Sequence, residues 1–390
     1  MSEIGFFWLL LPVAAAAGWL LARQGQRRQQ GAQTETLRSN YFRGLNYLLN
    51  EQPDKAIEVF LQIAARDQET VETQLALGNL FRRRGEVDRA IRLHQGLIAR
   101  PNLDSDQKIQ AMLALGEDYM RAGLLDRAEN LFSDLVGVGG SAPTALTHLV
   151  SIYQQERDWH KAIEHARRLE SLSGESQSTQ IAHFYCELAE QALARHDPEA
   201  TERHLDLAFA SQPNAVRALM LKGRMAFGQG ESNKAVRAFE QAIDQDIDCV
   251  PEVLPSILAC CEKLGDAARA ETFLRGVSER YRGVLPLIEL ARLREAKDGP
   301  AAAAAFLETE LQQRPSIRGL CHLIEIKARV VNDDERNRLS SLADLTRRLI
   351  EDHPVYRCTR CGFSARAHHW QCPGCRSWST MRPIHGIAVD

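Results

Sequence analysis

The sequence is poor in aromatic residues and has no large excess of charge of either sign. Phe, Trp and Tyr make up 6% of its 390 residues, and the formal net charge is −3. A balance of this kind gives no indication of nucleic-acid binding, for which a strongly basic surface is typical. Runs of β-branched residues with a period of two are also scarce, whereas Ala, Leu, Arg, Glu and Gln are abundant. These are strong helix formers, so we expect an all-α protein.

Motifs of common catalytic sites are missing as well. The sequence has no P-loop, no Gly-x-Ser-x-Gly elbow and no His-Glu-x-x-His pair. The glycine-rich stretch from Gly137 to Gly140 lacks the lysine that a P-loop needs. We therefore predict that the protein is not an enzyme.

The cysteines do not form the spaced framework of a disulfide-rich secreted domain. There are nine of them, an odd number, and five are scattered through helical sequence: Cys186, Cys249, Cys260, Cys261 and Cys321. Such isolated cysteines usually behave as small buried apolar residues. The composition therefore fits a reducing compartment better than an oxidising one.

One long hydrophobic run is present, at the N-terminus. Ile4 to Ala22 contains no charged residue, and a helix of this length spans about 28 Å, close to the thickness of a bilayer core. Arginines follow the run, whereas a cleaved signal peptide, the alternative, has basic residues before it. We expect a transmembrane signal-anchor helix over residues 1–22 and a cytoplasmic juxtamembrane linker over residues 23–36.

The middle of the chain repeats with a period of about 34 residues, which is the period of tetratricopeptide (TPR) repeats. A good copy has a glycine, an aromatic residue three positions later, an alanine twelve positions after the glycine, and a large apolar residue after four more. The best copies are Gly44-Tyr47-Ala56-Phe60, Gly78-Phe81-Ala90-His94 and Gly116-Tyr119-Ala128-Phe132; looser ones are Val150-Tyr153-Ala162-Ala166 and Gly223-Ala235-Phe239-Ala242; degenerate ones lie near Ala200, Ala270 and Ala303. In the second copy a histidine replaces the apolar residue.

This pattern predicts stacked helical hairpins. The glycines let two helices approach closely, and the aromatic and alanine side chains fill the seam between them. Because one hairpin cannot bury its apolar face alone, we expect a superhelical TPR solenoid over residues 37–350, in preference to an unrelated helical bundle. The concave face of such a solenoid binds peptides or partner proteins. The residues predicted to line that groove, each of which could instead be a solvated surface residue, are Asn79, Arg82, Glu117, Met120, Arg217 and Arg224.

The last forty residues contain the most specific chemical motif. Cys358-Thr-Arg-Cys361 and Cys372-Pro-Gly-Cys375 are two C-x2-C pairs separated by ten residues. Four thiolates in this spacing can surround one metal ion tetrahedrally. We therefore predict a metal-binding knuckle over residues 351–390 with these four cysteines as ligands. Thiolate coordination suits iron, as in rubredoxin, and zinc, as in zinc ribbons, so the metal stays open.

Other residues of this segment have predicted structural roles. Gly362 and Gly374 give the tight turns their backbone freedom, and a small apolar core is predicted from Tyr356, Phe363, Trp370 and Trp378. Since four cysteines complete the coordination shell, we interpret the remaining histidines as surface residues: His353, His368, His369 and His385. We also expect the knuckle to pack against the last helices of the solenoid.

The order of these parts resembles one known family, the lipopolysaccharide assembly protein B (LapB, also YciM) proteins of Gram-negative bacteria. The resemblance rests on the segments FFWLLLPVAAAAGW, YFRGLNYLLNEQPDKAIEVF and YRCTRCGF…WQCPGCRSW, and extends over nearly the whole chain. It implies a single-pass inner-membrane protein whose C-terminal bulk faces the cytoplasm. It also implies Cys358, Cys361, Cys372 and Cys375 as ligands of the metal.

The same resemblance implies a function. LapB-like proteins are adaptors that limit lipopolysaccharide by promoting degradation of the lipid A deacetylase LpxC by the membrane protease FtsH. They also coordinate other lipopolysaccharide synthesis or transport proteins. The resemblance leaves a homodimer open and implies no nucleic-acid partner.

Three alternatives remain from the residues alone. One is a rubredoxin-like electron-transfer protein, which would need iron and a redox partner. Another is a general TPR scaffold for a membrane complex. The third is a nucleic-acid-binding ribbon, since the knuckle contains Arg357, Arg360, Arg366 and Arg376, but a long basic run is missing.

Overall fold

The computed structural model describes residues 42–44, 46–47, 50, 52–66, 71–138, 140–351 and 353–386. The predicted transmembrane helix over residues 1–22 and the linker over residues 23–36 lie outside this range. Within the described range, every helix is too short or too polar to cross a membrane.

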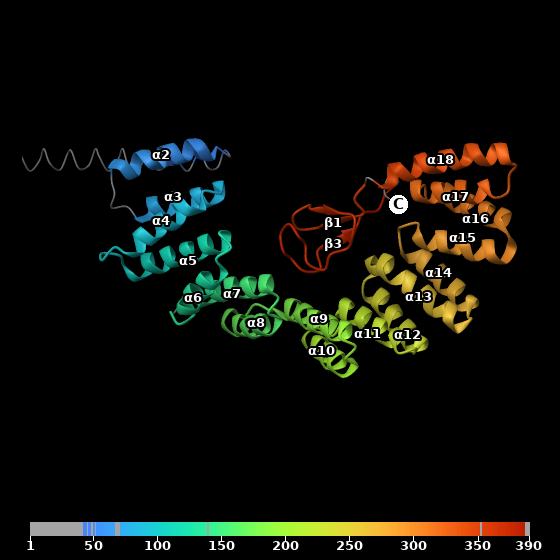
Figure 1. Ribbon diagram of the computed structural model, residues 1–390, viewed down its shortest axis with the longest axis horizontal. Coiled ribbons are helices and arrows are strands. Elements are labelled where there is room, and N and C mark those ends of the chain that lie inside the picture. Colours follow the sequence, from blue (N-terminus) through green and yellow to red (C-terminus); the bar gives the residue numbers. More distant parts are fainter. Residues whose placement is uncertain are drawn as a thin grey trace, which may run out of the picture. The chain divides into compact units, whose positions relative to one another are not determined.

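The chain divides into two compact units. The first runs to Asp158 and also includes Ser171–Ser173, and its helices follow one another along the chain, coloured blue to green in Figure 1. Its helices are α2 (Pro53–Arg66), α3 (Val71–Arg84), α4 (Val87–Ile98), α5 (Ser105–Arg121), α6 (Leu125–Val136) and α7 (Ala142–Glu156). Each packs on the next.

The second unit contains the remaining helices and a small sheet. Its helices are α8 (Trp159–Ser173), α9 (Ser178–Ala194), α10 (Pro198–Ser211), α11 (Val216–Gly228), α12 (Ser232–Gln245), the 3₁₀ turn η1 (Ile247–Cys249), α13 (Val250–Leu264), α14 (Ala267–Arg280), α15 (Leu285–Asp298), α16 (Pro300–Gln313), α17 (Ile317–Ala328) and α18 (Asp333–Glu351). The strands are β1 (Tyr356–Cys358), β2 (Ser364–Ala365) and β3 (Met381–Pro383). The prediction of a helical TPR-type solenoid with a small C-terminal knuckle is confirmed, while the strands make the fold more than all-α.

The repeat glycines lie where one helix of a hairpin meets the other. A Cβ atom added to Gly116 would lie 2.5 Å from Cζ of Phe132, and one added to Gly223 would lie 2.4 Å from Cε1 of Phe239. Both phenylalanines are almost fully buried. The close approach of the helices therefore depends on the missing side chain, as the spacing predicts.

His94 replaces the phenylalanine in the second repeat, and its imidazole fills the same space. A Cβ atom on Gly78 would lie 2.3 Å from Nε2 of His94. A polar ring at this depth needs a partner, and Nδ1 of His94 lies 2.5 Å from the buried carboxylate of Asp118. Arg82 donates to the other oxygen of Asp118 at 2.8 Å and also pairs with Glu117. The substitution thus introduces a buried polar network into the first unit.

The core of the second unit runs through α11 to α17. It is built from aliphatic side chains and includes Phe239 and Tyr281. Three of the scattered cysteines, Cys249, Cys260 and Cys261, are buried in it. This burial agrees with their interpretation as small apolar residues.

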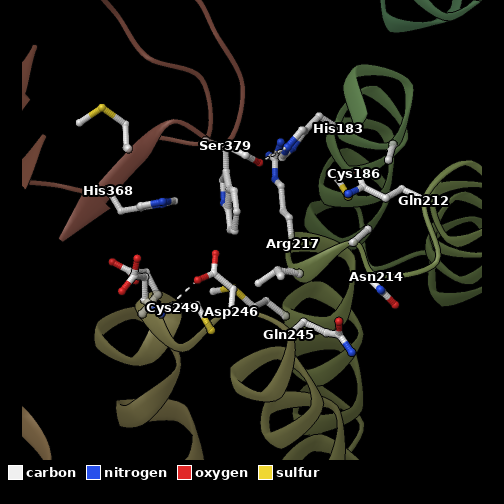
Figure 2. Close-up of a pocket in the computed structure, with 18 of the residues that line it drawn as sticks. His183, Cys186, Gln212, Asn214, Arg217, Gln245, Asp246, Cys249, His368 and Ser379 are labelled. Atoms are coloured by element: carbon white, nitrogen blue, oxygen red, sulfur yellow. Dashed lines mark hydrogen bonds between the residues drawn. The ribbon is translucent and has the colours of Figure 1, made fainter. Parts of the chain in front are cut away.

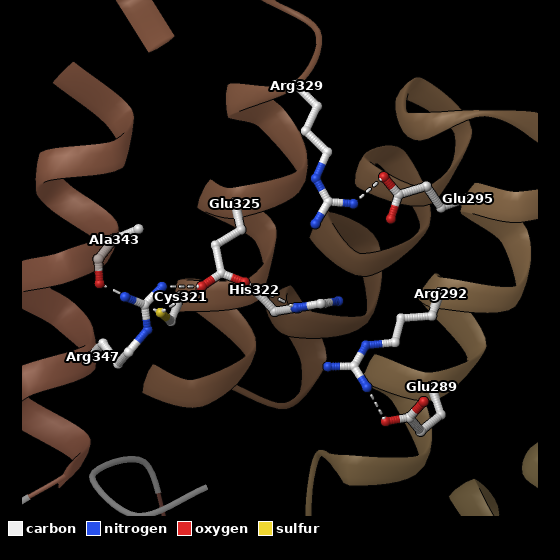
Figure 3. Close-up of polar contacts among 9 residues, drawn as sticks. All are labelled: Glu289, Arg292, Glu295, Cys321, His322, Glu325, Arg329, Ala343 and Arg347. Atoms are coloured by element: carbon white, nitrogen blue, oxygen red, sulfur yellow. Dashed lines mark hydrogen bonds and ion pairs between the residues drawn. The ribbon is translucent and has the colours of Figure 1, made fainter. Parts of the chain in front are cut away.

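The last helical pair is joined by polar contacts. Arg347 on α18 donates to Glu325 on α17 at 2.6 Å (Figure 3). Beside them, the thiol of Cys321 lies 3.6 Å from the backbone oxygen of Ala343. These contacts fix α18 against α17 immediately before the chain enters the knuckle.

The knuckle contains a three-stranded antiparallel sheet in the order β2-β1-β3. Tyr356 of β1 pairs with Ala365 of β2 on one side and with Pro383 of β3 on the other. Its core is formed by Tyr356, Cys358, Cys372 and Met381. So small a core depends on a cross-link for stability, and the cysteines within it can supply one through a metal.

Candidate metal centre and its contact with the helical repeats

The four cysteines of the knuckle lie together. Their sulfur atoms are all within 4.8 Å of one another, and Sγ of Cys358 lies 3.7 Å from Sγ of Cys375, as does Sγ of Cys361 from Sγ of Cys372. A disulfide would need about 2.05 Å. Four sulfurs at about 2.3 Å from one tetrahedral metal would instead be about 3.8 Å apart. The site therefore has the donor set and the dimensions for one thiolate-bound metal ion.

The two cysteine turns share one hydrogen bond pattern and one left-handed residue. The amide of Gly362, the residue after Cys361, donates to the carbonyl of Cys358 at 3.0 Å, and its φ is 77°. In the second turn, the amide of Arg376 donates to the carbonyl of Cys372 at 2.8 Å, and its φ is 57°. The left-handed residue of the second turn is therefore an arginine.

This geometry corrects the predicted role of Gly374. No positive φ is found at Gly374. A Cβ atom there would instead lie 3.3 Å from Cβ of Phe363 and 3.4 Å from Sγ of Cys361. The glycine lies where the two cysteine turns face each other closely, so a larger residue there would press on Phe363 and Cys361.

Hydroxyl groups surround two of the sulfurs. The hydroxyl of Thr380 lies 3.3 Å from Sγ of Cys358, and that of Ser377 lies 3.4 Å from Sγ of Cys375. The hydrogen bond with Thr380 lowers the pKa of Cys358 to about 6, and the one with Ser377 lowers the pKa of Cys375. Both thiols are thereby favoured as thiolates, the form that binds metal.

The predicted aromatic core of the knuckle is only partly correct. Tyr356 is buried in it, but Phe363 is 38% exposed. Trp370 packs against the core of the second unit, and Trp378 stacks on His183 of α9 with ring centroids 4.7 Å apart. The two indoles therefore connect the knuckle to the solenoid and do not build its own core.

Polar contacts join the same surfaces. Nε2 of His183 lies 2.7 Å from the hydroxyl of Ser379. The hydroxyl of Tyr356 donates to Glu252 on α13, and Arg382 donates to Asp246 just before η1. We call the contacts of Tyr356, Trp370, Trp378, Ser379 and Arg382 with α9 to α13 the clasp. The expectation that the knuckle packs against the last helices is therefore corrected, because the clasp reaches back to the middle of the solenoid.

Arg217 of α11 is at the centre of the clasp. It is 5% exposed and pairs with Glu187 at 2.8 Å and Glu190 at 2.7 Å. Its guanidinium also lies 5.8 Å from the ring centroid of Trp370 and 6.0 Å from that of Trp378, distances typical of cation–π contacts. Although predicted as a groove residue, Arg217 is covered by the knuckle.

The other predicted groove residues fall into two separate places. In the first unit, Arg82 and Glu117 form an ion pair, and Asn79 and Met120 are partly buried on α3 and α5. In the second unit, Arg224 is half exposed and lies 3.5 Å from Glu190. Each group is local to its own unit.

Two of the four knuckle histidines are not surface residues. His368 is partly buried between Tyr356 and Trp370, and burial lowers its pKa to about 4. His385 packs edge-on against Tyr281, with ring centroids 5.2 Å apart. His385 was misjudged because the sequence does not show which part of the solenoid the knuckle packs against.

Sequence reasoning also missed the helical half of the clasp. Its residues His183, Asp246 and Glu252 are 104 to 196 positions away from their partners in the knuckle. One local signal was present. Glu187 and Glu190 follow His183 on α9 at spacings of four and seven residues, which place all three side chains on the same face of the helix. Such a polar face indicates a contact surface.

Comparisons with known proteins place these features in one context. The family model of the rubredoxin metal binding domain matches residues 356–383, and tetratricopeptide repeat models match residues 75–107, 113–176 and 186–249. Lipopolysaccharide assembly protein B of Escherichia coli strain K12 is 40% identical over 99% of both chains. The protein of the same name from Haemophilus influenzae is 34% identical over 98% of both chains.

Proposed function

Because this chain belongs to the lipopolysaccharide assembly protein B family, we propose that it acts in lipopolysaccharide assembly as a non-enzymatic adaptor. The main support is the extent of the similarity, which covers 99% of both chains and therefore includes the solenoid and the knuckle together. A solenoid supplies an extended surface for partner proteins. A closed four-thiolate site suits a structural metal, since it has no open position for a substrate.

We propose in addition that the adaptor promotes FtsH-dependent proteolysis of LpxC at the inner membrane. In this proposal residues 1–22 are a single-pass anchor, and the solenoid faces the cytoplasm, where the protease and its substrate meet. A tether of this kind raises the effective concentration of the partners without any new contact. Coordination of other lipopolysaccharide synthesis or transport proteins would use the same tether.

The clasp gives the knuckle a mechanical role in this proposal. It joins α9, α11 and α13 through one small domain, so these helices are held by more than their contacts with neighbouring helices. Solenoids otherwise depend on nearest-neighbour interfaces, which makes them compliant. A metal-stabilised knuckle would therefore keep the second unit in one binding-competent arrangement.

The proposal is tested by depleting the protein in its own host and following LpxC. Turnover of LpxC should slow and its level should rise, and re-expression of the full chain should restore both. A catalytically inactive FtsH serves as the control, because depletion should then have no further effect. Unchanged LpxC turnover after depletion would refute the proteolytic role, whereas a defect in lipopolysaccharide without that change would leave the assembly role standing.

A second candidate function is rubredoxin-like electron transfer. One observation favours it: Cys361 is exposed, so an iron at this site would lie close to the surface. Iron in protein purified from its host, with a reversible redox couple, would support this role. Zinc in the same preparation would exclude it.

A further inference from the structure

A cavity of about 180 Å³ lies between the knuckle and the helices that it clasps. Figure 2 shows Arg217, His183 and Ser379 on one side of it and Asp246 and Cys249 on the other. The amides of Asn214 and Gln245 are exposed at its edge. The cavity is separate from the cysteine site, because none of the four cysteines of the metal centre lines it.

Buried polar atoms face this cavity without a partner. Nη2 of Arg217 is bonded to Glu190, but Nη1 of the same side chain has no hydrogen-bond acceptor among the described residues, although Arg217 is 5% exposed. Nδ1 of His183, on a residue that is 6% exposed, has no partner there either. Leaving such groups unpaired in a protein interior is unfavourable, because they lose their hydrogen bonds to water and gain none in return. The positions therefore call for a hydrogen-bonding occupant.

The charges around the cavity exclude a strongly charged ligand. Arg217 is already neutralised by Glu187 and Glu190, and Arg382 by Asp246. Asp248 and Glu252 add negative character, which disfavours an anion. The unpaired Nη1 of Arg217 is a hydrogen-bond donor on a cationic group, which disfavours a cation next to it. What remains unmet is hydrogen-bonding capacity.

The size and the mixed lining narrow the choice further. A volume of about 180 Å³ exceeds that of a single water, which takes up about 30 Å³ in the liquid, and falls below the roughly 300–1,000 Å³ of sites for drug-sized ligands. Apolar surface from Val216, Met220 and Trp370 alternates with the polar groups. A saturated ring that has hydroxyl groups at its edge and C–H groups on its faces matches both the volume of the cavity and its mixed lining.

We propose that this cavity binds a small, uncharged, polyhydroxylated molecule of monosaccharide size. Arg217 Nη1 donates to a ligand oxygen, the carboxylates of Asp246 and Glu252 accept from its hydroxyl groups, and the amide of Asn214 closes the edge. Because the site is formed by both the knuckle and the solenoid, an occupant would contact both halves of the clasp. This binding does not depend on the proposed adaptor role.

The test is ligand-observed saturation-transfer NMR on the full-length chain, in a detergent without a sugar headgroup and in a buffer without glycerol. The probes are D-glucose, N-acetyl-D-glucosamine and myo-inositol, with inorganic phosphate and ethylamine as charged competitors. We expect saturable binding of at least one neutral probe, with no displacement by either competitor.

Three variants locate the binding. Ala215→Leu places a larger side chain in the lining of the cavity and should abolish binding of the neutral probe. Asn214→Ala removes one exposed amide without touching the core and should weaken binding about three- to tenfold, the effect of one lost hydrogen bond. Gln241→Ala, which removes an exposed amide of α12 outside the cavity, should leave it unchanged. Circular dichroism and metal content confirm that each variant is folded.

Several results would overturn the proposal. One is the absence of saturable binding by all three neutral probes, which would identify the occupant as water. Another is displacement by phosphate or ethylamine, which would assign the cavity to a charged ligand. Unaltered binding in both Ala215→Leu and Asn214→Ala would place the bound sugar elsewhere.

Discussion

Replacing Gly223 by alanine should destabilise the second unit, although alanine is the better helix former. The added Cβ would lie 2.4 Å from Cε1 of Phe239 and 2.7 Å from its Cδ1 and Cζ atoms. Carbon atoms in favourable contact are about 3.5–4.0 Å apart. The ring must therefore move by about 1 Å, and it is only 2% exposed.

The magnitude follows from two opposing effects. Overpacking of a filled core costs about 1–3 kcal/mol, whereas the change from glycine to alanine inside a helix gains up to about 1 kcal/mol. We expect a net loss of about 1–2 kcal/mol. Gly276 of α14 is the matched control, because its added Cβ would have no neighbour within 4 Å, so Gly276→Ala should gain about 0.5–1 kcal/mol.

The assay is thermal unfolding of the full chain under identical conditions. The two single variants should shift the midpoint in opposite directions and differ by roughly 3–12 °C, at about 2–4 °C per kcal/mol for a unit of this size. Adding Phe239→Leu to Gly223→Ala should recover part of the loss, since the shortened side chain makes room for the methyl group. Stabilisation by Gly223→Ala equal to that by Gly276→Ala would refute the packing role of the glycine.

Three further predictions concern the knuckle, pH and the membrane. Cys358→Ser with Cys361→Ser should release the metal and unfold the knuckle, seen as rapid amide exchange over residues 353–386 while most of the helical circular dichroism remains; slow exchange there would contradict the coupling of metal and folding. Burial lowers the pKa of His183 to about 3 from its ordinary 6.5. Because the unfolded chain then binds this proton at a higher pH than the folded one, the free energy of unfolding should fall as the pH drops from 6.5 towards 3. His183→Gln should reduce that fall by up to about 1.4 kcal/mol per pH unit, and a pH profile identical to that of the original chain would show that His183 is not buried in its neutral form. Deletion of residues 1–22 should yield protein that fractionates away from membranes and supports LpxC turnover only weakly, and full activity of the truncated form would remove the need for a tether.

The contacts that could be predicted from the sequence are those set by the spacing of residues close together in the chain. The glycine of each repeat stands sixteen positions before the residue it contacts, as Gly116 and Phe132 show, and a period can be read from one chain. The two C-x2-C pairs likewise bring four sulfurs together through two short turns. In both cases the contacts follow from positions close in sequence.

The sequence did not predict what depends on distant pairing. Arg217 has the pattern of a groove residue, yet the knuckle covers it, and Trp370 and Trp378 have the pattern of a local core, yet they contact the solenoid. His385, which packs against Tyr281, was misjudged for the same reason. The contacts of each of these side chains depend on how the knuckle docks on helices more than a hundred positions away in the sequence. No local repeat pattern predicts that docking.

The long reach of the clasp has a consequence for how the protein is made. The bond between His183 and Ser379 spans 196 positions, so it forms only after Ser379 has left the ribosome. The repeats can stack one after another during translation, because each needs only its neighbour. The knuckle can dock only after residue 379 has been made: a chain that stops between α13 and the knuckle retains the hairpins already made but leaves the surface of α9 and α11 that contacts Trp370 and Trp378 open to water.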